Sequence, residues 1–252
     1  MNIKMIALDL DGTLLHDDKT VSNYSKTIIQ KCREKGIKVI FATVRGTTQN
    51  IIPSELFDGC VKKSGAMAYD GDELIYKRTM SLNDVRDLLL ACDEAGLKTV
   101  VQNNGDGIHY SNFNVSEVWS DLTNYKIINF AEIKFDADKV YVLTETTKSV
   151  NIIKSNLPKN VYMFTSRDNL TFISHEEAVK FKATMALAEH WGIKREEIAS
   201  FGDDSIDIDM LQHCGIGVAM GNALEEVKAV ADYVCDSNNN DGVAKWIEQN
   251  IL

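Results

Sequence analysis

The 252-residue sequence contains no paired cysteine motif, no long apolar run and no excess of positive charge. Its five cysteines lie far apart without a Cys-x-x-Cys pair, which argues against disulfide or zinc frameworks and favours reduced thiols inside a cell. No run of about 18 apolar residues is present, as a membrane span would need, and Asp9 interrupts the N-terminal apolar run too early for a signal peptide. We therefore expect a cytoplasmic protein.

The charge balance argues against two classes of partner. The 27 basic and 37 acidic residues give a net charge of −10, which disfavours general binding to nucleic acid or to an anionic membrane. The length and the 44% hydrophobic content allow one large or two modest globular domains. The sequence shows no internal repeat, and we expect a monomer or a weak homo-oligomer.

Strand-like and helix-like segments alternate from the start, which is typical of a parallel sheet covered by helices. The pattern begins with an apolar strand that ends at Asp9, a helix over 22–35 and a second strand over 38–42. It changes near Ser81 and returns after Ser174. The intervening segment has helices and strands of its own and is long enough to form a separate small domain.

We therefore predict an α/β protein in which one domain interrupts another. Residues 1–80 and 177–252 form a Rossmann-like core with a parallel sheet. Residues 81–176 form a smaller, inserted α+β domain.

Two aspartates, one residue apart, stand at the end of the first apolar strand. Asp9 and Asp11 are placed at i and i+2, so in an extended chain they would point to the same side. Carboxylates held close together repel each other unless a cation lies between them. An Asp-Gly pair also commonly begins a solvated turn, and that simpler interpretation stays open at this point.

Candidate site groups follow three of the apolar strands. Thr43 follows the second strand, and Asp203 and Asp207 follow a later one that ends near Phe201. Ligands of parallel α/β sheets bind beyond the carboxyl ends of the strands, so these groups are expected to converge with Asp9 and Asp11. Several carboxylates in one place call for a divalent metal, and hard oxygen ligands select Mg²⁺.

A site lined by carboxylates also needs donors if it is to accept an anionic substrate. The Thr43 hydroxyl and the backbone amides of Gly12 and Thr13 are candidate donors to phosphate oxygens. Lys180 would add a positive charge, although Lys182, two positions on, competes for that role and both lysines would ordinarily lie at the surface.

Taken together, these segments resemble the four motifs of the haloacid dehalogenase superfamily, and the C-terminal part resembles its Cof-type phosphatases of subfamily IIB. The matching segments are Asp9-Leu-Asp11-Gly12-Thr13-Leu14, the strand end at Thr43, Lys180 ahead of 186–193, Gly202-Asp203-x-x-x-Asp207, and the C-terminal stretches 219–223, 231–234 and 241–244. The resemblance covers nearly all of the expected core, in order.

The resemblance implies a Mg²⁺-dependent phosphatase acting on a small phosphorylated metabolite, with an inserted α/β cap of the C2B type. It makes Asp9 the nucleophile that forms an aspartyl phosphate and Asp11 the general acid and base. Further roles follow from the same resemblance. Mg²⁺ is bound by Asp9, the Asp11 backbone carbonyl and Asp203, supported by Asp204 and Asp207; phosphate is bound by Gly12, Thr13, Thr43, Arg45 and Lys180.

Three positions depart from the family pattern. Val44 replaces the glycine of the second motif, Ile206 replaces an asparagine of the fourth, and Ser64 begins a segment that reads Asn-Gly-Ala in many relatives. Small displacements at a reaction centre can cost about 100-fold in rate. A phosphometabolite-binding sensor and a capped phosphosugar mutase are therefore the alternatives to a hydrolase.

The substrate is expected to be selected by the inserted domain. Candidate residues there are Asn103, Asn104, Asp106, His109, Arg167 and Asp168, each of which is more often a turn or surface residue. The sequence leaves sugar phosphates, nucleotides and cofactor phosphates open as substrates.

Overall fold

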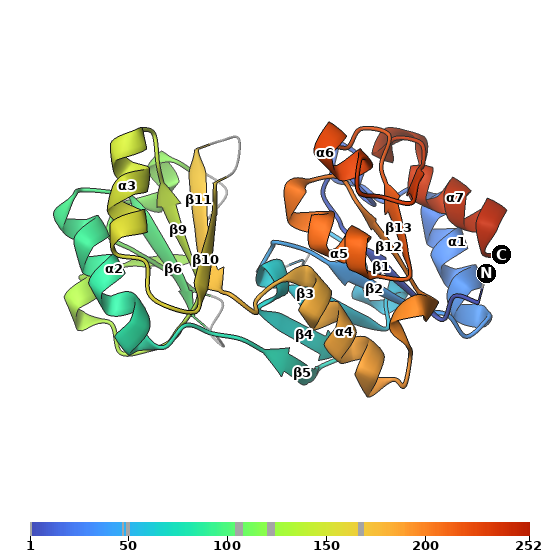
Figure 1. Ribbon diagram of the computed structural model, residues 1–252, viewed down its shortest axis with the longest axis horizontal. Helices are drawn as coiled ribbons and strands as arrows, with labels where there is room; N and C mark the ends of the chain where they lie inside the picture. The colour runs from blue at the N-terminus through green and yellow to red at the C-terminus, as the bar shows by residue number, and fades with distance from the viewer. Residues whose placement is uncertain (1, 47, 49–50, 104–107, 120–123, 166–168) are drawn as a thin grey trace. The chain divides into compact units, whose positions relative to one another are not determined.

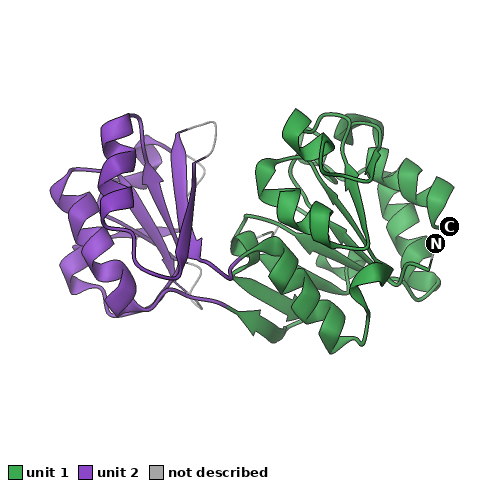
Figure 2. Cartoon of the chain, in the orientation of Figure 1, with its two compact units in different colours: residues 1–77, 179–252 green, residues 78–178 purple. Residues whose placement is uncertain are grey.

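The computed structural model describes residues 2–46, 48, 51–103, 108–119, 124–165 and 169–252. The chain forms two compact units, shown in green and purple in Figure 2. Unit 1 consists of residues 1–77 and 179–252, and unit 2 of residues 78–178. The boundaries expected from the sequence, after residues 80 and 176, lie close to these positions.

Unit 1 contains an eight-stranded sheet in the order β14-β13-β12-β1-β2-β3-β4-β5. The pairs from β14 to β3 are parallel, whereas β4 and β5 add two antiparallel strands at one edge. The strands are β1 (Met5–Leu8), β2 (Lys38–Ala42), β3 (Gly59–Lys62), β4 (Met67–Asp70), β5 (Glu73–Lys77), β12 (Ile198–Gly202), β13 (Ile216–Ala219) and β14 (Tyr233–Val234). The predicted α/β fold with a parallel sheet is confirmed.

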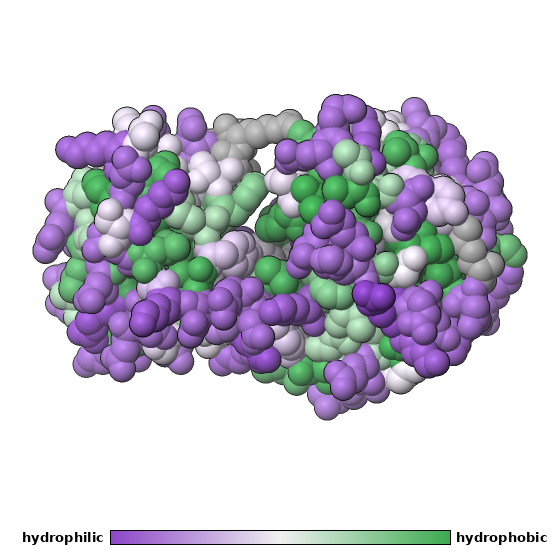
Figure 3. All heavy atoms as spheres, in the orientation of Figure 1, coloured by the Kyte–Doolittle hydropathy of each residue, from purple (hydrophilic) through white to green (hydrophobic). Residues whose placement is uncertain are grey.

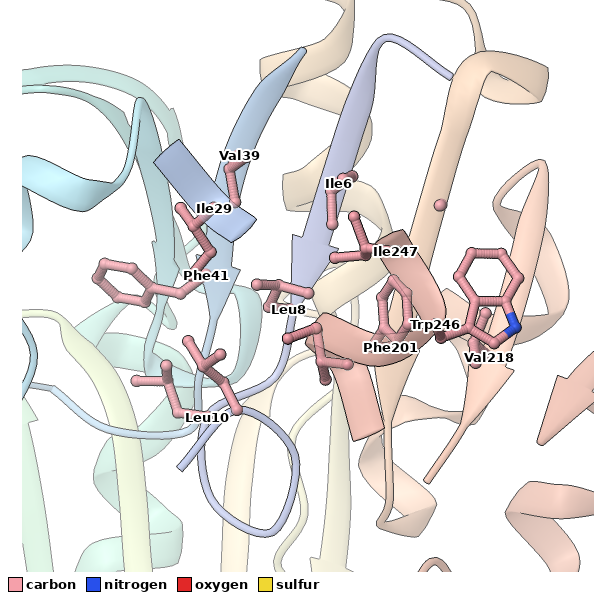
Figure 4. Close-up of a cluster of buried hydrophobic side chains, with 14 of the residues drawn as sticks. Ile6, Leu8, Leu10, Ile29, Val39, Phe41, Phe201, Val218, Trp246 and Ile247 are labelled. Atoms are coloured by element: carbon pink, nitrogen blue, oxygen red, sulfur yellow. The ribbon is translucent and has the colours of Figure 1, made fainter. Parts of the chain in front are cut away.

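Helices cover both faces of this sheet (Figure 1). They are α1 (Asn23–Glu34), α4 (Lys180–His190), α5 (Ile208–His213), α6 (Glu225–Lys228) and α7 (Gly242–Asn250). α1 and α7 pack on one face, where Ile29, Trp246 and Ile247 meet strand residues such as Leu8 and Phe201 (Figure 4). α4 and α5 pack on the other face. The central strands are thus buried on both sides, as their continuous apolar sequences require.

Local sequence determines where the first helix, α1, begins and ends. The Ser22 hydroxyl accepts a hydrogen bond from the Ser25 amide at 2.9 Å and so caps the start of α1. Gly36, with φ of +78°, ends the helical segment in a left-handed conformation. Both boundaries agree with the helix predicted over 22–35.

Unit 2 contains a six-stranded sheet in the order β10-β11-β9-β6-β7-β8. The strands are β6 (Thr99–Asn103), β7 (His109–Ser111), β8 (Tyr125–Ile127), β9 (Ala137–Leu143), β10 (Val161–Thr165) and β11 (Leu170–His175). Helices α2 (Leu82–Glu94) and α3 (Thr147–Ser155) lie on the same face of it (Figure 1). The edge strand β8 was not predicted, because its three residues are too short to give a periodic signal.

The surface is largely hydrophilic on the face shown. Hydrophilic residues cover much of both units on the face shown in Figure 3. Within the described ranges, none of the helices has the length and apolarity needed to cross a bilayer.

Candidate active site

The candidate site lies at the carboxyl ends of three adjacent strands of unit 1. Asp9 follows β1, Thr43 follows β2 and Asp203 follows β12, and β1 pairs in parallel with both of the other strands. The Asp9 amide continues the pairing by donating to the Phe201 carbonyl at 3.0 Å. The predicted convergence of strand ends is therefore seen for these three residues.

Lys180 occupies the centre of the site. Its side chain is fully buried, and its ammonium group donates to Asp9 Oδ1 at 2.5 Å and to Asp207 Oδ1 at 2.7 Å. Burial disfavours the charged lysine, but the two carboxylates outweigh that effect and raise the Lys180 pKa. Lys182, the competing candidate, is exposed.

A close backbone approach allows Lys180 to reach this position. A Cβ atom on Gly65 would lie 2.2 Å from the carbonyl carbon of Val179, so only glycine fits beside the start of α4. Ser64, which precedes it, is buried and has a positive φ of 61°. The Ser64 amide donates to the Thr43 carbonyl at 3.1 Å, so this turn connects the start of α4 with the end of β2.

Asp207 holds the turn after β12 through its second carboxylate oxygen. Asp207 Oδ2 accepts hydrogen bonds from the amides of Asp203 at 3.1 Å and Asp204 at 3.2 Å. The Asp204 carboxylate in turn accepts from the Ser205 amide. These hydrogen bonds from Asp204 and Asp207 close the short helical turn Ser205–Asp207 without a polar side chain at residue 206.

The carboxylate oxygens of Asp9, Asp203 and Asp207 lie within 4.8 Å of one another. Burial raises the pKa of Asp9 well above its usual value, and burial together with the charge of Asp207 raises the pKa of Asp203 to about 7. The Thr13 hydroxyl donates to Asp203 Oδ1 at 2.9 Å and fixes that side chain. This all-oxygen set, in which the carboxylates repel one another, fits a hard divalent cation such as Mg²⁺.

The Asp11 carboxylate is not part of this acidic cluster, and the chain that carries Asp9 and Asp11 is not an extended strand. The strand β1 ends at Leu8, and the chain then turns, with Gly12 at φ of +80°. The strand alternation on which the expectation rested therefore does not reach Asp11. A Cβ on Gly12 would lie 2.4 Å from Asp203 Oδ2, so this turn packs directly against the acidic cluster.

The Asp11 carboxylate forms ion pairs with two cations. Arg45 donates to it through Nε at 2.6 Å and through a terminal nitrogen at 2.7 Å, and Lys19 Nζ lies 2.9 Å from Asp11 Oδ1. Partial burial raises the Asp11 pKa, but the hydrogen bonds from Arg45 and Lys19 outweigh it and leave the pKa below its usual value. Arg45, expected at the phosphate, therefore contacts the candidate acid and base in this structure.

The expected phosphate donors are only partly available in this structure. Thr43 is buried, and its hydroxyl accepts from the Arg45 amide at 3.1 Å, which leaves the hydroxyl proton for another acceptor. Thr13 differs from expectation, because its amide donates to the Leu10 carbonyl at 3.3 Å and its hydroxyl to Asp203. Both donors of Thr13 thus have protein acceptors, and its contacts position Asp203.

Sequence reasoning missed two residues that contact this loop. Lys19 pairs with Asp11, and Asn222 Nδ2 donates to the Gly12 carbonyl at 2.8 Å. The Asn222 side chain also accepts from the Asn238 amide at 2.9 Å, which ties the loop to a distant part of the chain. Gly221 and Asn222 lie in a segment that resembles the family, but no spacing pattern in the sequence indicates this contact.

Two of the specificity candidates in unit 2 lie on described strands. Asn103 ends β6 and His109 begins β7. The other four, Asn104, Asp106, Arg167 and Asp168, lie outside the described residues.

Comparisons with known proteins agree with this geometry. Residues 6–247 match the model of the haloacid dehalogenase-like hydrolase family. The chain is 30% identical over 262 residues to the 5-amino-6-(5-phospho-D-ribitylamino)uracil phosphatase YcsE of Bacillus subtilis, covering 100% of this chain and 97% of that protein. It is 27% identical over 267 residues to YitU, a Bacillus subtilis phosphatase named for the same substrate, covering 97% and 96%.

A solved structure of a HAD subclass IIB sugar phosphatase superimposes with a TM-score of 0.85 at 26% identity, covering 98% of both chains. The family match, the full-length similarity and the acidic cluster at the strand ends lead to one assignment. The chain belongs to the haloacid dehalogenase-like hydrolases and is a Cof-type phosphatase within them.

Proposed function

We propose that the protein is a Mg²⁺-dependent phosphatase that hydrolyses a small phosphomonoester through an aspartyl phosphate on Asp9. The observation that carries this proposal is the buried cluster around Lys180, in which one ammonium group contacts the carboxylates of Asp9 and Asp207. In its ionised form, a carboxylate such as Asp9 needs no base to act as a nucleophile. The residues that would hold Mg²⁺ are Asp9, Asp203 and the Asp11 backbone carbonyl, with Asp207 and Asp204 holding the turn behind them.

Bound Mg²⁺ supplies positive charge that offsets the repulsion between the carboxylates and the phosphate. In the first step, a carboxylate oxygen of Asp9 attacks phosphorus and forms a P–O bond while the bond to the leaving oxygen breaks. Asp11, in its protonated form, donates a proton to that leaving oxygen, which departs as an alcohol. Lys180 and the Thr43 hydroxyl orient the transferring phosphoryl group and stabilise its charge.

In the second step, water attacks phosphorus and the bond to Asp9 breaks, which releases inorganic phosphate and restores the carboxylate. Asp11 now accepts the proton from the water. Because Asp11 is paired with Arg45 and Lys19 in this structure, we infer that these pairs loosen when the substrate binds, so that Asp11 can take up and release a proton.

The inserted unit is proposed to act as a C2B-type cap that selects the non-phosphate part of the substrate. Support for a small substrate comes from the relatives, two of which are named for a phosphorylated ribitylamino uracil and one as a sugar phosphatase. We propose a phosphorylated sugar or polyol derivative as the substrate class.

The test is phosphate release from a panel of small phosphomonoesters, with and without Mg²⁺, for the wild type and Asp9→Asn. The wild type should release phosphate only with Mg²⁺, and Asp9→Asn should lose at least about 1000-fold in kcat. Asp72→Asn, in an exposed turn of unit 1, is the matched control.

Two outcomes would contradict hydrolysis. Retained ligand binding without phosphate release by the wild type would identify a sensor. An isomerised phosphosugar without phosphate release would identify a mutase.

A further inference from the structure

The strand β13 ends beside the strands that carry the candidate site. It pairs in parallel with β12, and Gly202 at the end of β12 lies opposite Ala219 at the end of β13. The chain that leaves β13 therefore starts at the same edge of the sheet as Asp203. This segment, residues 220–224, carries Asn222, which has no part in the proposed reaction steps.

Backbone hydrogen bonds fix this segment to the turn after β12. The Met220 amide donates to the Gly202 carbonyl at 3.0 Å, and the Leu224 amide donates to the Asp203 carbonyl at 3.1 Å. Met220 is also fully buried, so the start of the segment is anchored in the core. The backbone of Asn222 is therefore held on both sides, close to Asp203.

The Asn222 side chain uses both ends of its amide. Its Nδ2 donates to the Gly12 carbonyl at 2.8 Å, and its Oδ1 accepts from the Asn238 amide at 2.9 Å. A carboxamide offers a donor and an acceptor in one short side chain, and here each has a partner of the matching kind. Asn222 thus connects the loop after β1 with the short helical turn Asn238–Asn240 that follows β14.

Asn238 gives this connection a rigid base. It is 3% exposed, and its side-chain amide donates to the Leu15 carbonyl and to the Asp17 carboxylate, both at 3.0 Å. The same loop is therefore held at Leu15 and Asp17 by a buried side chain and at Gly12 by Asn222. Although Asn222 is exposed, its own partner Asn238 is fixed.

The peptide group that Asn222 holds lies against Asp203. Its first residue, Gly12, leaves no room for a Cβ atom beside the Asp203 carboxylate. Its second residue, Thr13, donates its hydroxyl to Asp203 Oδ1 at 2.9 Å. A rotation of this peptide group would move both contacts, so the hydrogen bond from Asn222 also helps to fix the position of Asp203.

The Asp11 carbonyl lies one peptide earlier in the same loop. The Leu10 carbonyl before it accepts from the Leu15 amide at 2.8 Å, and the Gly12 carbonyl after it accepts from Asn222. Between them, the Asp11 carbonyl accepts no hydrogen bond from the residues that the structure describes. Its neighbours are thus held in place while its own oxygen stays available to a cation.

We propose that Asn222 is a positioning residue for the metal site, which keeps the Asp11 carbonyl and the Asp203 carboxylate at a fixed separation by holding the Gly12 carbonyl. This role rests on the proposed function, in which the Asp11 carbonyl and Asp203 bind Mg²⁺. Groups that orient metal ligands typically change metal affinity 10–100-fold when they are removed. Mg²⁺ binding does not require that a phosphoester is hydrolysed, so the two proposals can fail separately.

The experiment titrates Mg²⁺ into the full-length protein and measures binding by calorimetry. Asn222→Ala should raise the Kd for Mg²⁺ about 10-fold, because the ligands lose their fixed separation. Asn250→Ala is the matched control, since exposed Asn250 also donates through Nδ2 to a backbone carbonyl at 2.8 Å, that of Trp246, and it should leave the Kd unchanged. Partial unfolding would lower the number of ions bound per chain and not the Kd, so a merely structural role is distinguished.

Phosphate release provides the second measurement. The Mg²⁺ concentration for half-maximal rate should rise by the same factor in Asn222→Ala, while KM for the phosphomonoester stays unchanged. A wild-type Kd for Mg²⁺ in Asn222→Ala, or an equal change in Asn250→Ala, would overturn the inference.

The two proposals give different results in these measurements. Weaker Mg²⁺ binding by Asn222→Ala, with no phosphate release by the wild type, would support the role of Asn222 and refute the proposed hydrolysis. Mg²⁺-dependent phosphate release with an unchanged Kd in Asn222→Ala would do the reverse. A wild type that binds no Mg²⁺ would refute both.

Discussion

The two units differ in whether their buried polar side-chain atoms have hydrogen-bond partners. In unit 1, the buried charges of Lys180, Asp9 and Asp207 satisfy one another through short hydrogen bonds. In unit 2, Gln102 Oε1 and Ser174 Oγ are buried without a hydrogen-bond partner among the described residues. Among those same residues, unit 1 has no such side-chain atom.

Under the proposed function, this difference would separate the reaction centre in unit 1 from substrate selection by unit 2. A reaction centre must hold its charged groups in fixed positions before the substrate arrives, because reorganisation during the reaction is costly. A selecting surface works in the opposite way, since polar atoms left unpaired reject ligands that cannot pair with them. Changes in unit 1 should therefore lower kcat for every phosphomonoester, whereas changes in unit 2 should alter selectivity.

The largest effect is expected for Lys180→Met. Removing the ammonium group leaves Asp9 and Asp207 as buried unpaired carboxylates, which should cost about 3–5 kcal/mol of unfolding free energy and at least about 100-fold in kcat. Lys182→Met, on the exposed side of the same helix, is the matched control and should change neither. Thermal unfolding and phosphate release measure the two effects, and near-normal turnover by Lys180→Met would contradict its central role.

Thr43→Val tests the proposed contact between the Thr43 hydroxyl and the phosphoryl group, and should affect stability less than Lys180→Met. The valine keeps the shape of the buried side chain but removes the hydroxyl proton, so kcat should fall about 100-fold with little change in KM. Thr43→Ser retains the hydroxyl and should recover most of the activity. If the valine and serine variants behave alike, the Thr43 hydroxyl does not contact the phosphoryl group.

Arg45→Gln tests the ion pair at Asp11 and should have a smaller effect. The guanidinium is bidentate but partly exposed, so its contribution to stability should be below about 1 kcal/mol, whereas the loss of orientation at Asp11 should lower kcat about 10-fold. The control is Arg33→Gln, since Arg33 contacts both carboxylate oxygens of Asp58 away from the site. Equal turnover by the two variants would show that Arg45 does not act through Asp11.

The sequence predicted the site best where regular structure determines position. Asp9, Thr43 and Asp203 follow strands whose parallel pairing brings their ends together, so their convergence could be inferred from the apolar runs alone. Lys180 and Lys182 could not be distinguished in this way, because the choice depends on which side of α4 faces the sheet and on the close approach at Gly65.

The sequence did not predict contacts where the chain leaves regular structure. The ion pairs of Asp11 depend on the turn at Gly12 and on Lys19, which itself has a positive φ of 65°. Neither conformation has a periodic signature in the sequence. A pocket of about 130 Å³ in unit 2 could not be predicted for a related reason. Its lining residues, Val100, His109, Trp119, Tyr141 and Leu170, come from four strands and a loop that are distant in sequence.

The smallest expected effect comes from a pair of buried serines, one in each unit. The Ser200 hydroxyl on β12 lies within hydrogen-bonding distance of two carbonyl acceptors, Met210 at 3.1 Å and Ile216 at 3.2 Å. The Ser174 hydroxyl on β11 is equally buried but has no hydrogen-bond partner among the described residues. Ser200→Ala should therefore lower the unfolding free energy by about 1 kcal/mol, and Ser174→Ala should leave it unchanged or raise it slightly.

Urea unfolding of both variants, followed by a probe in each unit, measures this contrast. Trp191 and Trp246 report on unit 1 and Trp119 on unit 2. Because each substitution removes the same hydroxyl from a buried strand position, the difference between the two values isolates the hydrogen bonds. Equal destabilisation by the two substitutions would mean that Ser174 is already paired within unit 2, and the contrast between the units would then rest on Gln102 alone.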